Sequence, residues 1–200
     1  MAVIGHGRKQ VGPAVAEVAE QLGRNIDTAI QEQQNGTGHA VQCAMEELEG
    51  FEGTVVVTNA DVPLLSPETL QELSATHDGA SVTVLSVNQD NPTGYGRILR
   101  TNDGMVTAIV EEKDATEKQK AITEVNSGVF AFDAAILRDG LAQLNTDNAQ
   151  GELYLTDVLS IARRAGHPVR AHIAADAAEL AGVNDRVQLC LLYTSDAADE

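Results

Sequence analysis

The sequence predicts an α/β fold built on a mixed, mostly parallel sheet that is flanked by helices. Short runs of β-branched residues alternate with segments whose apolar residues recur at helical spacing, as in strands connected by crossover helices. The run Val55 to Thr58 fits a parallel strand that stops at Asn59 and Asp61, and in such folds the carboxyl ends of strands form the ligand crevice. An Asp103-Gly104 turn predicts a β-hairpin that interrupts the alternation.

The composition describes an acidic protein large enough for one sizeable core. Thirty acidic and 13 basic residues among 200 give a formal charge of −17, which repels the phosphate backbone and disfavours nucleic-acid binding. The two cysteines have no disulfide spacing. No apolar run has the length of a membrane span, and the N-terminus lacks a signal-peptide pattern. We therefore expect a cytoplasmic protein without membrane contact.

Two strand–helix units are predicted in the first quarter of the chain. Residues 1–4 form a strand that turns through glycines into a helix over residues 11–22. A short strand over residues 26–31 leads through the loop 36–38 into a second helix, which we expect Thr37 to cap. This Gly-Thr-Gly loop can present backbone N–H groups to a nucleotide, or it is only a flexible connection; alone it does not decide between the two.

Asp61 has no evident structural role in the predicted fold. Pro63 ends the strand, and Ser66 with Pro67 already supplies the cap and first position of the next helix. An acid at a strand end is common without function, so the residues leave both interpretations open. A functional carboxylate would hold a divalent cation, because an acidic protein needs positive charge to bind an anionic ligand.

The second half of the chain adds strands, helices and the hairpin. Within one of these strands, Asn126 and Gly128 stand where Val or Ile would pack better, which predicts close approach of a ligand. Asp133 is expected to cap the helix that follows. The expected elements are strands over residues 81–87, 124–132 and 169–173, a hairpin over 97–110, and helices over 66–77, 116–120, 133–144 and 158–162 and from 186.

Five motifs then occur in one order along the chain. They lie at residues 34–40 (Gln-Asn-Gly-Thr-Gly-His-Ala), 61–64 (Asp-Val-Pro-Leu), 94–98 with 110–116, 124–128, and 148–157 with 182–184. In order and spacing they resemble the pyrophosphorylase domain of the bifunctional N-acetylglucosamine-1-phosphate uridyltransferases and glucosamine-1-phosphate acetyltransferases. The resemblance extends to Leu189. Other sugar nucleotidyltransferases share the sheet, but the Asn148-Ala-Gln-Gly-Glu152 run is more specific to this family.

The resemblance implies a Rossmann-like nucleotidyltransferase sheet, with the hairpin as an insertion, in a partial domain over residues 1–189. It implies that the family's first strand and phosphate-binding loop would precede Met1, and that residues 190–200 are a non-native tail. On this interpretation the remaining sheet is unstable or rearranged. The chain as written is then expected to have little or no uridyltransferase activity, which pyrophosphate release from UTP and N-acetylglucosamine-1-phosphate would check.

The implied reaction is transfer of uridylate from UTP to N-acetylglucosamine-1-phosphate. It gives UDP-N-acetylglucosamine and pyrophosphate for cell-wall precursor synthesis, with Mg²⁺ as the cofactor. The resemblance implies that Asp61 and Asn184 bind Mg²⁺, that Gln31 reads the uracil edge, and that Gly36 and Thr37 lie against the uridine. It also implies that the N-acetylglucosamine pocket is lined by Gly96, Glu111, Asn126, Tyr154 and Thr156.

Two other functions stay open on the sequence alone. One is a nucleotidyltransferase that uses another sugar 1-phosphate, which substrate profiling would distinguish. The other is a noncatalytic UDP-sugar-binding module, which would bind the nucleotide sugar without turnover. A homotrimer is expected only for the full-length protein of the family, because its trimerising acetyltransferase domain has no counterpart in this sequence.

Overall fold

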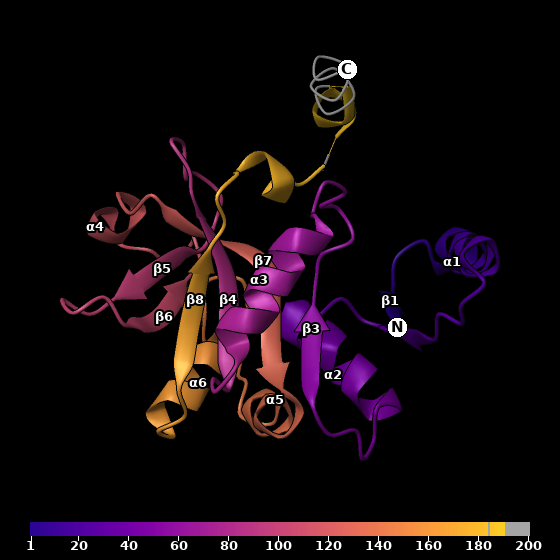
Figure 1. Cartoon of the computed structure of the whole chain (residues 1–200), viewed down its shortest axis with the longest axis horizontal. Helices are drawn as coiled ribbons and strands as arrows, with labels where there is room; N and C mark the ends of the chain where they lie inside the picture. Colours follow the sequence, from indigo (N-terminus) through magenta and orange to yellow (C-terminus); the bar gives the residue numbers. More distant parts are fainter. Residues whose placement is uncertain (184, 191–200) are drawn as a thin grey trace.

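The computed structural model, which describes residues 1–183 and 185–190, divides the strands between two sheets (Figure 1). β1 (Ala2–Ile4) and β2 (Thr28–Ile30) form a two-stranded parallel sheet. The larger, six-stranded sheet has the order β6-β5-β7-β4-β8, and β3 also pairs with β7. Its strands are β3 (Thr54–Val57), β4 (Val82–Asn88), β5 (Arg97–Arg100), β6 (Val106–Val110), β7 (Glu124–Asp133) and β8 (Val169–Ile173).

β7 organises the larger sheet because it is its longest strand and pairs with three others. β4 pairs along one edge of β7, whereas β5 and β3 share the other edge at opposite ends. The mixed sheet is confirmed, but among the described ladders only β1–β2 and β4–β8 are parallel, so the expected parallel majority is wrong. β3, expected to be a parallel strand, is antiparallel to its described partner. The reason is that β7 lies beside both β3 and β4 and runs in the opposite direction to each of them.

Helices cover both faces of the larger sheet (Figure 1). Along β4, Val82 and Val84 pack with α2, α5 and α6, whereas Leu85 and Val87 pack with α3, because successive side chains of a strand point to opposite faces. Each face is therefore a buried apolar layer. The helices are α1 (Arg8–Leu22), α2 (Thr37–Glu47), α3 (Pro67–His77), α4 (Glu117–Lys120), α5 (Ala134–Leu141) and α6 (Asp157–Arg164), with a 3₁₀ turn, η1 (Ala178–Leu180).

The helix caps test the local predictions directly. The Ser66 hydroxyl accepts the Thr69 N–H at the start of α3, and the Asp133 carboxylate accepts two N–H groups of α5, as predicted. Thr37 does not cap α2: its hydroxyl oxygen accepts the N–H of Leu155 instead. The prediction failed because the actual partner is distant in sequence.

The hairpin and the remaining elements also match the sequence. β5 and β6 pair antiparallel around the Asp103-Gly104 turn, and Arg97 joins the hairpin to β7 through Val125. Over the described ranges, none of the helices is both long and apolar enough to cross a bilayer. Asn184 and residues 191–200, which make up most of the proposed tail, lie outside the described residues.

Candidate functional site

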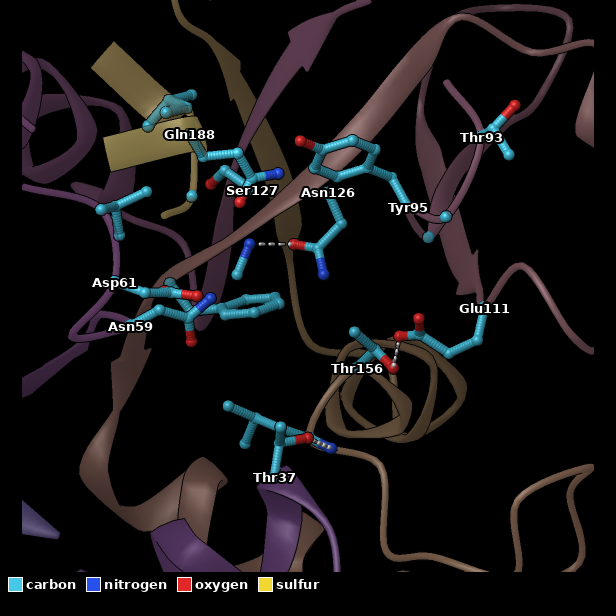
Figure 2. Close-up of a pocket in the computed structure, with 18 residues that line it drawn as sticks. Thr37, Asn59, Asp61, Thr93, Tyr95, Glu111, Asn126, Ser127, Thr156 and Gln188 are labelled. Carbon is cyan, nitrogen blue, oxygen red and sulfur yellow. Dashed lines mark hydrogen bonds between the residues drawn. The ribbon is translucent and has the colours of Figure 1, made fainter. Parts of the chain in front are cut away.

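A pocket of about 450 Å³ lies beyond the end of β3 and reaches the starts of β5 and α6 (Figure 2). The residues that line it come from separate segments spread along the chain between Thr37 and Gln188. The strand ends therefore form the crevice that the sequence predicts. Six of the predicted site residues line this pocket: Thr37, Asp61, Gly96, Glu111, Asn126 and Thr156.

Asp61 presents its carboxylate to the pocket. Among the described residues, no hydrogen bond or ion pair engages its side chain, while its backbone carbonyl accepts the N–H of Val183 at 2.8 Å. This backbone bond brings the segment 182–183 beside Asp61. Figure 2 shows the Asn59 side chain next to Asp61.

The conformation of Gly128 explains the position of Asn59. Gly128 has φ +83°, and a Cβ atom there would lie 2.2 Å from Asn59 Nδ2. The space that the sequence suggested for a ligand at this glycine is thus filled by a protein carboxamide. Asn126 fixes the Gly128 backbone within β7, because its Oδ1 accepts the Gly128 N–H at 2.9 Å.

Glu111 and Thr156 form the opposite wall of the pocket (Figure 2). Thr156 Oγ1 donates to Glu111 Oε1 at 3.0 Å, and Glu111 Oε2 takes no part in this bond. Burial raises the pKa of Glu111 above its ordinary 4.5, the Thr156 bond opposes the rise, and the nearby Asp157 and Asp114 add to it. Burial likewise raises the pKa of Asp157, the acidic residue at the start of α6. This wall is therefore acidic and partly desolvated.

Thr156→Val should make the free energy of unfolding more dependent on pH. Because the pKa of Glu111 is raised in the folded state, its contribution to stability is present below pH 4.5 and is lost as pH rises through the folded value. Removing this side-chain donor, which opposes the rise, should raise the pKa further, with a loss of about 1–3 kcal/mol at neutral pH. Urea denaturation from pH 4 to 8 measures it. Thr156→Ser, which keeps the hydroxyl, is the control; parallel pH curves for wild type and Thr156→Val would refute the assignment.

Three predicted residues lie outside this pocket. Gln31 is buried, and its Nε2 donates to the Gly36 carbonyl at 3.1 Å. Gly36 has φ +104°, and a Cβ there would lie 2.6 Å from the Leu153 carbonyl oxygen. The Tyr154 hydroxyl donates to Asp114 Oδ2 at 3.2 Å and accepts from Gln150. Gln31 bonds to Gly36, which directly precedes the lining residue Thr37. Tyr154 directly precedes the lining residues Leu155 and Thr156.

Sequence reasoning missed several lining residues. Asn59 stands two positions before Asp61 at the same strand end, and this position could have indicated that Asn59 also lines the pocket. Thr93 and Tyr95 belong to the glycine-containing loop before β5, and Ser127 lies between two residues already singled out. Nothing in the sequence signalled Gln188.

A mixed sheet flanked by helices, with a polar pocket beyond its strand ends, is the architecture of an α/β protein that binds its ligand at the edge of the sheet. Residues 12–178 match the Nucleotidyl transferase family, and the chain belongs to that family. It is 96% identical over 189 residues to the Bifunctional protein GlmU of Corynebacterium jeikeium, and 71% identical over 191 residues to that of Corynebacterium efficiens. Each match covers 94% of this chain, which spans about 39% of the length of these relatives.

Two solved structures have the same fold at low sequence identity. The crystal structure of UDP-glucose pyrophosphorylase complexed with UDP-glucose has a TM-score of 0.73 at 14% identity, and covers 100% of this chain and 82% of that chain. A putative glucose-1-phosphate thymidylyltransferase from Bacillus anthracis, in complex with a sucrose, has a TM-score of 0.67 at 18% identity and covers 96% and 74%. These likenesses support the fold assignment.

Proposed function

We propose that the pocket serves uridylyl transfer from UTP to N-acetylglucosamine-1-phosphate, giving UDP-N-acetylglucosamine and pyrophosphate. The observation that carries the proposal is the convergence on one pocket of six residues that the resemblance assigns to the metal, nucleotide and sugar sites. The 96% identity to a Bifunctional protein GlmU supports it. The proposed setting is cell-wall precursor synthesis in the cytoplasm.

The hydrogen bonds within the pocket leave a distinct set of groups for a ligand. Thr37 Oγ1 already accepts the Leu155 N–H, so its own O–H can donate. Asn126 Oδ1 already accepts the Gly128 N–H, so its amide nitrogen can donate. Glu111 Oε2 can accept from a sugar hydroxyl. This pattern of donors and acceptors suits a nucleotide sugar, with Gly96 allowing close approach.

The metal proposed for this site is Mg²⁺. Asp61 offers a carboxylate that no residue in the described part of the chain bonds, and Asn59 places a carboxamide beside it (Figure 2). Hard oxygen donors of this kind fit Mg²⁺, which proteins hold through one or two carboxylates together with substrate phosphates. Asn184, the second proposed ligand, follows the segment tied to Asp61. When bound, the ion would neutralise charge on the phosphates.

The chain's own contribution to the reaction is positioning. A sugar 1-phosphate oxygen attacks the α-phosphorus of UTP in line and pyrophosphate leaves, so no protein nucleophile is needed. Glu111, Asn126 and Thr156 would orient the sugar, and Thr37 would orient the nucleotide. Gln31 and Gly36 would shape the uridine side through their mutual hydrogen bond. Tyr154 would act on the sugar side by holding the 148–156 segment against Asp114.

Calorimetry with UDP-N-acetylglucosamine, UDP-glucose and UDP tests this proposal. We expect UDP-N-acetylglucosamine to bind at least about tenfold more tightly than UDP-glucose, because a site that hydrogen-bonds a substituent discriminates against its absence. Asn126→Asp keeps an oxygen to accept the Gly128 N–H but replaces the donating amide nitrogen, and it should remove most of the difference. Equal affinities for the two nucleotide sugars would favour a nucleotidyltransferase for another sugar.

A further inference from the structure

A second pocket, of about 630 Å³, lies at the other end of the sheet. It is formed by the end of α3, the turn of the β5–β6 hairpin, and the connection from α6 to β8. It shares no lining residue with the first pocket. Val106 lines it at the start of β6, whereas Glu111 lines the first pocket just beyond the end of the same strand, so five residues of strand, roughly 17 Å, separate them.

The walls of this second pocket are basic in a strongly acidic protein. The chain has 30 acidic and 13 basic residues, yet three arginines and a histidine line the pocket and none of its lining residues is Asp or Glu. Its basic residues are Arg100, Arg163, His167 and Arg170.

Two of these arginines form no ion pair among the described residues, although the exposed Asp103 in the hairpin turn is near enough to Arg163 for that charge to help lower the Asp103 pKa. Arg163 Nη1 donates to the Val106 carbonyl at 2.6 Å, and Arg170 Nη1 donates to the carbonyls of Thr76 and Asp78. Arg100 differs because it is paired with Glu124 at 2.6 Å. The carbonyl bonds fix two guanidinium groups at the pocket without neutralising their charge.

Carbonyl binding alone explains only part of this arrangement. A guanidinium carries five N–H donors, and the bonds to carbonyls use only Nη1 of Arg163 and Nη1 of Arg170. The remaining nitrogens of both side chains can donate to an oxyanion, with the fork geometry that suits phosphate. Beside them, Met105, Val106 and Pro168 form an apolar wall.

We propose that this pocket binds a small phosphate monoester through Arg163 and Arg170, with the organic part of the ligand against the apolar wall. The site is separate from the nucleotidyl-transfer pocket, and the proposal does not depend on the activity proposed there. The pairing of two fixed charges with an apolar surface distinguishes it from general attraction of anions to arginine.

Titration of the ¹⁵N-labelled chain with phenyl phosphate and with inorganic phosphate tests the proposal. We expect saturable amide shifts at Gly104 and Gly166, which line the pocket, and tighter binding of phenyl phosphate because inorganic phosphate has no apolar group. Shifts centred on Gly96 and Gly128, or no saturable shifts, would overturn the proposal.

Charge-matched variants make the test specific. Arg163→Gln and Arg170→Gln should each weaken phenyl phosphate binding by about tenfold, since each removes charged hydrogen bonds. Arg164→Gln is the control, because Arg164 is the exposed neighbour of Arg163, does not line the pocket, and its loss changes the net charge equally. An equal loss in Arg164→Gln would show that only long-range charge matters and would overturn the proposal. Dispersed amide spectra verify that each variant is folded.

Discussion

Asp61→Asn should reduce the Mg²⁺-dependent part of UTP affinity at least about tenfold and leave the fold intact. The carboxylate faces the pocket and no described residue bonds to it, so its removal breaks no hydrogen bond or ion pair within residues 1–183 and 185–190. Losing one charge-assisted oxygen ligand costs about 1.5–3 kcal/mol, which corresponds to about a 10- to 150-fold change in affinity. Calorimetry of UTP binding in excess Mg²⁺ and in EDTA measures it.

The comparison in EDTA separates a metal ligand from a general charge effect. Without the metal, Asp61→Asn should bind UTP no more weakly than wild type, because one negative charge near the triphosphate has been removed. Asp90→Asn, at an exposed position outside the pocket, is the matched control and should behave like wild type in both buffers. An equal loss of affinity with and without Mg²⁺ would contradict the role given to Asp61.

Gly128→Ala should destabilise the chain by about 2–4 kcal/mol and weaken the Mg²⁺-dependent affinity for UTP. At φ +83° a side chain costs about 1–2 kcal/mol, and the new methyl group would also overlap the Asn59 carboxamide, 2.2 Å away. Asn59 must then move from its place beside Asp61. Urea denaturation and the calorimetric assay measure the two effects.

Gly104→Ala is a closely matched control for this prediction. Gly104 has φ +85°, but a Cβ there would have no neighbour within 4 Å. It should therefore show only the conformational cost and no loss of UTP affinity. If both alanine variants lose the same stability and neither affects binding, the contact between Gly128 and Asn59 has no functional role.

The sequence predicts the strands and helices well because most of their signals are local. The Ser66 and Asp133 caps and the Asp103-Gly104 turn depend on neighbouring residues, and each is found. The direction of β3 is different, because a run of β-branched residues is the same in a parallel or an antiparallel ladder. Only the position of β7 beside it decides this point.

The site is less predictable because distant residues determine its details. Thr37 bonds to Leu155, which lies 118 positions away, instead of capping its own helix. Asn59 is placed by Gly128, and neither residue alone indicates the other. The second, basic pocket had no sequence signal at all, since Arg100, Arg163 and Arg170 are brought together only by the fold.

The most direct test of the central claim is an amide-shift titration of the chain with UDP-N-acetylglucosamine in the presence of Mg²⁺. We expect saturable shifts at the amides of Gly96, Asn126, Gly128 and Thr156, with Asp61→Asn reducing the Mg²⁺-dependent part of the response. Saturable binding with shifts confined to other parts of the molecule, or no binding by a folded chain, would contradict it.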